Sequence, residues 1–94
     1  MTAAYRAGRD VGVTVIDDDL TVYLAPLPDG PVMVLDGVAA LIWVEATTAP
    51  AAGWRRRVAE AFGEPEERIA GDVAAFVTDL CGRGLIEPVP VDGA

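Results

Sequence analysis

The 94-residue sequence contains no histidine, no lysine and a single cysteine. Without histidine it lacks the commonest general base and metal ligand, and one cysteine cannot form an internal disulfide. The longest apolar run, residues 38–44, is far shorter than the roughly 18–20 residues of a membrane-spanning helix. The first ten residues lack the apolar core of a signal peptide. We therefore expect a cytoplasmic protein that does not enter a membrane.

The charge of the chain is strongly one-sided. Seven basic residues, all arginine, face 15 carboxylates, which gives a formal net charge of −8. Because DNA affinity depends largely on neutralising phosphates, this charge argues against nucleic acid as a partner and favours a basic peptide. The 52% content of hydrophobic residues is enough for the core of one small domain and too high for a disordered chain.

The first part of the chain predicts three strands. Residues 11–15 and 20–24 alternate apolar and other side chains, as half-buried strands do, and an aspartate triplet at 17–19 separates them as a turn. Residues 32–35 are apolar throughout, which indicates a strand that is buried on both faces or borders a groove. We expect these strands to form a small antiparallel sheet.

The second part of the chain predicts three helices. Asp36 is a suitable N-cap for the first helix, which runs to Glu45, and Gly63 is a suitable C-cap for the second, residues 54–62. The third helix opens with the acidic, proline-containing stretch 64–67 and continues with one apolar stripe. That stripe consists of Ile69, Val73, Phe76, Val77 and Leu80.

These elements predict an α+β fold of the winged helix-turn-helix type, with a three-stranded antiparallel sheet followed by three helices. We expect the domain to span residues 11–89, preceded by a flexible lead-in, 1–10, and followed by a flexible tail, 90–94. Leu85 and Ile86 form a short extended return after the third helix, and Trp43 is expected to pack the first helix on the sheet.

The chain offers little equipment for catalysis. Cys81 is a lone helical cysteine without a histidine to activate it, so we interpret it as a small core residue. The triplet at 17–19 lacks the alternating ligand spacing of a calcium loop, and residues 82–84 follow a helix instead of preceding one as a phosphate loop does. Residues 55–57, all arginine, are interpreted as a solvated helix face. We therefore predict no enzyme, no metal site and no cofactor.

Two stretches together resemble the PqqD-like family, the recognition elements for precursor peptides of ribosomally synthesised, modified peptides. The first is Val-Leu-Asp-Gly-Val-Ala-Ala-Leu-Ile-Trp at residues 34–43. The second is Asp-Val-Ala-Ala-Phe-Val-Thr-Asp-Leu at 72–80, followed by Gly-Leu-Ile at 84–86. The resemblance covers roughly residues 11–89. The alanine- and proline-rich stretch before Trp54 and the N-terminal ten residues depart from it.

The resemblance implies that a leader peptide binds as an added strand against the third strand, in a cleft walled by the third helix. An apolar strand at a sheet edge meets the requirement for such pairing. The aspartates of the wall would favour basic leader residues, and its apolar side chains would receive apolar anchors, although these apolar residues are equally suited to the core. The candidate peptide-binding residues are Val32, Met33, Val34, Leu35, Asp72, Val73, Phe76, Asp79, Leu80 and Arg83.

The sequence thus predicts a non-catalytic peptide chaperone that presents a precursor peptide to a modifying enzyme or a leader peptidase. Lasso-peptide maturation is the first choice of pathway, and biosynthesis of a quinone cofactor of the PQQ type is the second. A winged-helix transcriptional regulator and a subunit that stabilises an enzyme without binding a leader are the alternatives from other classes.

Overall fold

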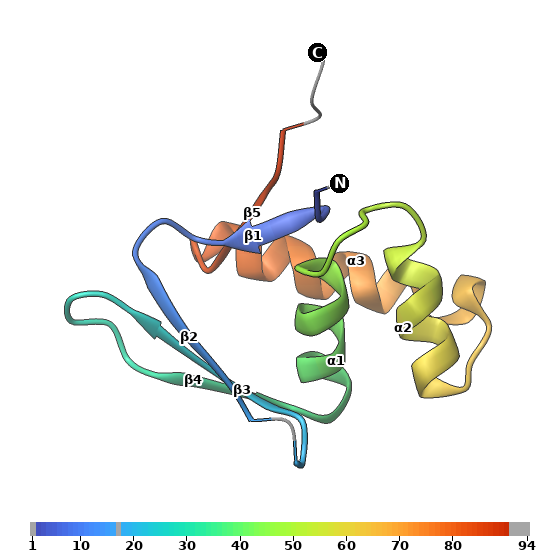
Figure 1. The fold of residues 1–94 in the computed structure, drawn as a ribbon, viewed down its shortest axis with the longest axis horizontal. Coiled ribbons are helices and arrows are strands. Elements are labelled where there is room, and N and C mark those ends of the chain that lie inside the picture. Colours follow the sequence, from blue (N-terminus) through green and yellow to red (C-terminus); the bar gives the residue numbers. More distant parts are fainter. Residues whose placement is uncertain (1, 17, 91–94) are drawn as a thin grey trace.

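The computed structural model describes residues 2–16 and 18–90 of the chain. Its elements are β1 (Tyr5–Ala7), β2 (Val11–Ile16), β3 (Thr21–Pro26), β4 (Met33–Asp36), α1 (Gly37–Ala46), α2 (Trp54–Phe62), α3 (Glu66–Gly82) and β5 (Ile86–Pro88). Strands β2, β3 and β4 form an antiparallel sheet in that order, and the three helices follow it along the chain (Figure 1). The predicted fold class is confirmed.

The central strand β3 defines the two faces of this sheet. Val22 and Leu24 are fully buried, whereas Tyr23 between them is 41% exposed, because successive side chains of a strand point to opposite faces. The register places Leu35 opposite Val22 and Val34 opposite Tyr23. Leu35 therefore joins the core, and Val34 lies on the outer face.

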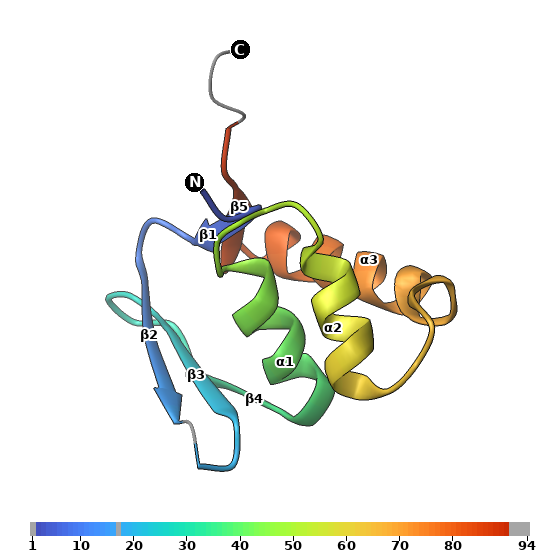
Figure 2. The same ribbon diagram turned by 45° about the vertical axis from the view of Figure 1, so that its right-hand side comes forward.

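Helix α1 covers the inner face of the sheet, and α2 and α3 pack behind it. α1 follows β4 directly and packs on β3 and β4, while α2 packs between α1 and α3 (Figure 2). Trp43 on α1 is 2% exposed, so its predicted place in the core is confirmed. Val58 from α2 and Leu80 from α3 belong to the same buried cluster, which makes one core out of sheet and helices. Among the described residues, no helix is both long and apolar enough to cross a membrane.

The helix ends follow the predicted signals with two corrections. Gly63 closes α2 with φ 79° and donates its N–H to the carbonyl oxygen of Ala59 at 2.8 Å. Asp36 occupies the N-cap of α1, but its side chain makes no capping hydrogen bond. α3 begins at Glu66 instead of in the stretch from residue 64, because Pro65 is extended and biases the residue before it away from the helix.

A second, two-stranded sheet corrects the prediction for the N-terminus. Residues 1–10 were expected to be a flexible lead-in, but β1 pairs antiparallel with β5, with Arg6 opposite Glu87. The Nε of Arg6 donates to Oε1 of Glu87 at 2.6 Å across this pair. A three-residue strand has no readable period, and its partner lies 81 residues away, so the sequence pattern gave no signal for it. Of the predicted tail, only Pro90 lies within the described residues.

Candidate functional site

β4 forms one edge of the three-stranded sheet. It pairs with β3 on one side, with Met33 opposite Leu24. On its other side, no strand of the described residues pairs with it. The backbone N–H and C=O groups along this side are therefore free to pair with an extended segment.

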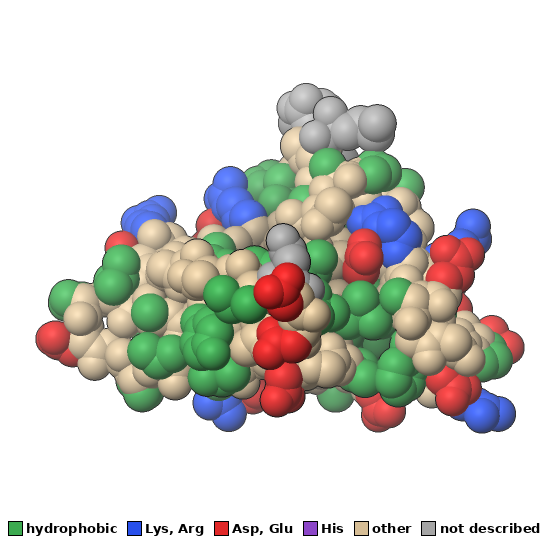
Figure 3. All heavy atoms as spheres, turned by 60° about the horizontal axis from the view of Figure 1, so that its bottom comes forward, with side chains coloured by type: hydrophobic (Ala, Val, Ile, Leu, Met, Phe, Trp, Pro, Cys, Tyr) green, Lys and Arg blue, Asp and Glu red, His purple; other side chains and the backbone are tan. Residues whose placement is uncertain are grey.

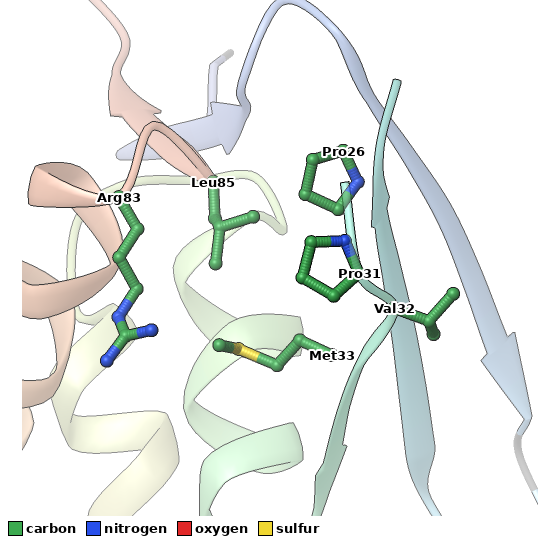
Figure 4. Close-up of a pocket in the computed structure, with 6 residues that line it drawn as sticks. All are labelled: Pro26, Pro31, Val32, Met33, Arg83 and Leu85. Atoms are coloured by element: carbon green, nitrogen blue, oxygen red, sulfur yellow. The ribbon is translucent and has the colours of Figure 1, made fainter. Parts of the chain in front are cut away.

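A cavity of about 360 Å³ lies between the start of β4 and the end of α3. Figure 4 shows Met33 reaching across it from β4, Arg83 reaching along it from the end of α3, and Leu85 pointing between the two. All of the lining side chains except that of Arg83 are apolar. The residues that line it are Pro26, Pro31, Val32, Met33, Arg83 and Leu85.

The four residues that were expected to form the cleft floor do not point the same way. Met33 is half-buried and points into the cavity, whereas the side chain of Val32 points away from it and is 61% exposed (Figure 4). Val34 is 53% exposed on the outer face, and Leu35 is 4% exposed within the core. The two faces of β4 thus differ, since one packs in the core and the other meets solvent. Of the residues of β4, Met33 alone projects into the cavity.

Two of the six residues expected on the helix wall belong to the core. Val73 is 2% exposed and Leu80 is 1% exposed, and both pack in the cluster formed by sheet and helices. They hold α3 in place behind the cavity. A direct contact of either side chain with a bound peptide would require the core to open, so their predicted role as anchor pockets has no geometric support.

The other four wall residues share one flank of α3. At 3.6 residues per turn, Asp72, Phe76, Asp79 and Arg83 fall on the same side of the helix. Arg83, the C-cap of α3, lines the cavity, so this flank meets the cavity at its C-terminal end. Phe76 is half-buried against the core, and the two aspartates are exposed. The Nε of Arg83 donates to Oδ2 of Asp79 at 3.0 Å, and both side chains remain more than half exposed.

Three cavity residues were missed by the sequence analysis. Pro26 and Pro31 flank the connection between β3 and β4, which lies between the two stretches predicted as strands, and Leu85 was assigned to a short extended return. Leu85 is 3% exposed, so it forms a fixed wall. Two features of the sequence could have indicated these residues. Leu85 is an apolar residue directly after Gly84, which follows the third helix, and the prolines stand close to the apolar strand.

The arginine cluster on α2 has a more specific structure than the predicted solvated face. Arg57 donates its Nε to Oε1 of Glu45 at 2.7 Å and its Nη2 to the carbonyl oxygen of Thr48 at 2.9 Å. It therefore ties the loop between α1 and α2 to both helices. The guanidinium of Arg55 lies 5.3 Å from the ring centroid of Trp54. These arginines act within the fold and lie outside the cavity described above.

The chemistry of the described residues is that of binding. They contain no group of three or more histidine, cysteine, aspartate or glutamate side chains that could hold a metal ion. Cys81 is a free thiol, half-buried against the core on the flank of α3 away from Arg83. The arrangement that remains is a free strand edge beside an apolar cavity with one guanidinium at its rim.

A family model described as coenzyme PQQ synthesis protein D (PqqD) matches residues 21–86, from the start of β3 to the start of β5. The chain belongs to the PqqD family. PqqD proteins are non-catalytic and bind peptides, so the prediction that the chain is not an enzyme is confirmed by its family. Members bind a precursor peptide and work together with a modifying enzyme. No curated protein and no solved structure gave a significant match.

The match covers more than half of the chain and contains every residue that lines the cavity. Strands β1 and β2 lie before the matched region. The PqqD match thus falls on the segment that carries both the free edge of β4 and the flank of α3.

Proposed function

We propose that this chain captures the leader segment of a precursor peptide at the free edge of β4 and presents the precursor to a modifying enzyme or a leader peptidase in the cytoplasm. Such tethering acts by raising the effective concentration of the substrate near the enzyme. The first choice of pathway is lasso-peptide maturation, and biosynthesis of a PQQ-type cofactor is the second.

The observation that carries this proposal is the position of the cavity directly beside an unpaired strand edge. A leader strand paired with β4 would place every second side chain on the inner face of the sheet, next to Met33. That side chain would enter the space between Met33 and Leu85 (Figure 4). Backbone pairing supplies affinity in this mode, and the apolar cavity supplies selection among leaders.

The proposed roles of the candidate residues follow from their places. Met33 contacts the inward-facing leader residue, and Val32 and Val34 contribute backbone groups. Asp72 and Asp79 attract basic leader residues along the exposed flank of α3. The Arg83 side chain borders the cavity and can donate its remaining N–H groups to leader acceptors. Leu35, Phe76, Val73 and Leu80 support this surface from behind.

A transcriptional regulator is disfavoured by the charge of the helix that would enter the major groove. The exposed charged residues of α3 and its C-cap are four carboxylates and two guanidiniums, namely Glu66, Glu67, Arg68, Asp72, Asp79 and the C-cap Arg83. Phosphate contacts supply most of the affinity of such proteins for DNA, so a helix with a net negative charge is poorly suited to bind in the major groove.

The test uses the labelled leader of the precursor peptide that is encoded beside the gene. The protein is titrated into this leader, and binding is monitored by fluorescence anisotropy. We expect saturable binding of the leader and no binding of a random DNA duplex at the same ionic strength. A leader that does not saturate while DNA does would overturn the proposal. A parallel titration with a PQQ-type precursor decides the pathway, since about tenfold tighter binding of one leader identifies the cognate class.

A further inference from the structure

The sheet has a second free edge, β2, at the opposite end of the strand order from β4. β2 pairs with β3 in an unbroken register from Val11 opposite Pro26 to Ile16 opposite Thr21, and no described strand pairs with its other side. It is six residues long and contains neither a charged residue nor a proline. Natural edge strands often carry an inward-pointing charge, a proline or a bulge, or are very short, because a free edge attracts other strands. β2 has none of these protections.

The inner face of β2 is also left uncovered. Val13 and Val15 lie opposite Leu24 and Val22, so all four side chains share the inner face of the sheet. Leu24 and Val22 are fully buried, whereas Val13 and Val15 are 40% and 41% exposed. Helix α1 packs over β3 and β4, and the core therefore ends in an open apolar surface along β2, formed by Val13 and Val15, which we call the ledge.

The charges at the two ends of β2 indicate what kind of strand fits there. The described residues that flank it are Arg9 and Asp10 before it and Asp18 and Asp19 after it, and all four are exposed. Three carboxylates thus face one guanidinium. Figure 3 shows acidic side chains running down the middle of the lower side of the molecule, between hydrophobic side chains over the sheet and over the helices. The charges of Arg9 and Asp10 cancel at one end, whereas Asp18 and Asp19 at the other end are both negative. A segment with lysine or arginine at the end that meets Asp18 and Asp19 complements this pattern.

The same charges argue against a second copy of this chain as the occupant. Two copies paired through β2 would bring six carboxylates and two guanidiniums together at the ends of the paired strands. Each chain also carries a net charge of −8, which opposes self-association. The apolar ledge and its acidic end are complementary to a different chain.

We propose that β2 is a second strand-docking edge, which binds an extended segment of a partner protein with apolar residues at alternate positions and basic residues at one end. The apolar residues of that segment extend the inner face beyond Val13 and Val15, and its basic residues meet Asp18 and Asp19 at the end of β2. This inference is independent of leader binding at β4. It gives the chain one edge for a peptide and another for a protein.

The experiment pans a phage-displayed library of random dodecapeptides against the Met33→Asp variant, in which binding at β4 is expected to be weakened. The enriched peptides are then synthesised and titrated against the wild type, Val15→Lys and Thr14→Lys. Val15→Lys places a charge on the ledge. Thr14→Lys adds the same charge to the same strand on the outer face, so it is the matched control. Circular dichroism checks the fold of each variant, and Val13→Lys replaces Val15→Lys if the latter is unfolded.

We expect enriched peptides that alternate apolar residues and carry a net positive charge. Their affinity should fall about tenfold with Val15→Lys and stay within about twofold of the wild type with Thr14→Lys. No enrichment over an unrelated protein, a preference for acidic peptides, or equal binding to Val15→Lys would overturn the proposal. A dimer of the wild type in sedimentation that Val15→Lys dissociates would overturn it in favour of a second copy.

Discussion

The two edges of the three-stranded sheet offer the same backbone groups in different surroundings. Opposite β4, Arg83 at the C-cap of α3 and Leu85 form a wall, and a cavity of about 360 Å³ lies between this wall and the strand. β2 has no such wall, and its inner valines end the core as an open ledge. An edge with a wall can select among side chains, whereas an edge without one depends on backbone pairing, apolar contact and charge at its ends. We therefore expect β4 to be the more selective edge.

The largest effect on leader affinity is expected from a substitution on the inner face of β4, and a substitution on its outer face serves as the control. Met33→Asp places a carboxylate in the apolar cavity, where it would lose hydration when the leader binds, so leader affinity should fall about 100-fold, or about 2.7 kcal/mol. Val34→Asp adds the same charge one residue away on the outer face and should change affinity by less than about threefold. Anisotropy titration of both variants measures the difference, and equal losses would show that the cavity is not the binding site.

The next prediction concerns the support of the wall. Gly8 is buried, donates its N–H to the carbonyl oxygen of Leu85 at 2.9 Å and leaves no room for a Cβ beside the Gly84 carbonyl. Gly8→Ala should therefore lower the free energy of unfolding by about 1–3 kcal/mol. Gly12→Ala on β2, where the nearest atom to an added Cβ is 3.7 Å away, should change it by less than about 0.5 kcal/mol. Urea denaturation measures both, and similar values for the two variants would contradict the idea that β1 supports the wall.

A smaller effect is expected from the acidic flank of α3. Asp79→Asn should weaken binding of a basic leader about threefold at low salt and flatten its salt dependence, because it removes one attractive charge. Its ion pair with Arg83 is exposed, so the stability should change by less than about 0.5 kcal/mol. Glu67→Gln removes an equal charge from the opposite flank of the helix and is the control. If both variants reduce the affinity equally, the effect is one of net charge alone.

The smallest expected effect is that of β2 on leader binding. Val15→Lys should leave the affinity for the leader within about twofold of the wild type, because the proposed leader site is at β4, at the other end of the strand order. Isothermal titration calorimetry of the leader with the variant checks this. A loss comparable to that of Met33→Asp would mean that the two edges are not separate sites.

Much of the fold could be predicted because its signals are local. The alternation of residues 11–15 and 20–24, the glycine after α2 and the apolar stripe of α3 each lie within one element, and all correspond to observed elements. The pairing of β1 with β5 could not be predicted, since it joins two three-residue segments 81 positions apart. Local pattern carries no information about such a contact.

The site could be predicted by element and only partly by residue. The apolar strand and one flank of the third helix were identified, and Met33 and Arg83 do line the cavity. Val73 and Leu80 were included because an apolar stripe does not indicate which of its members face the core and which face a groove. Leu85 was missed because its place depends on how the chain turns back after α3.

Amide hydrogen exchange with and without a saturating leader tests the central claim most directly. We predict that exchange slows at those amides of Met33–Asp36 that face away from β3, while the amides of Val11–Ile16 exchange at their unliganded rates. Slowed exchange along β2 with no change in β4 would contradict the assignment of the leader to the walled edge.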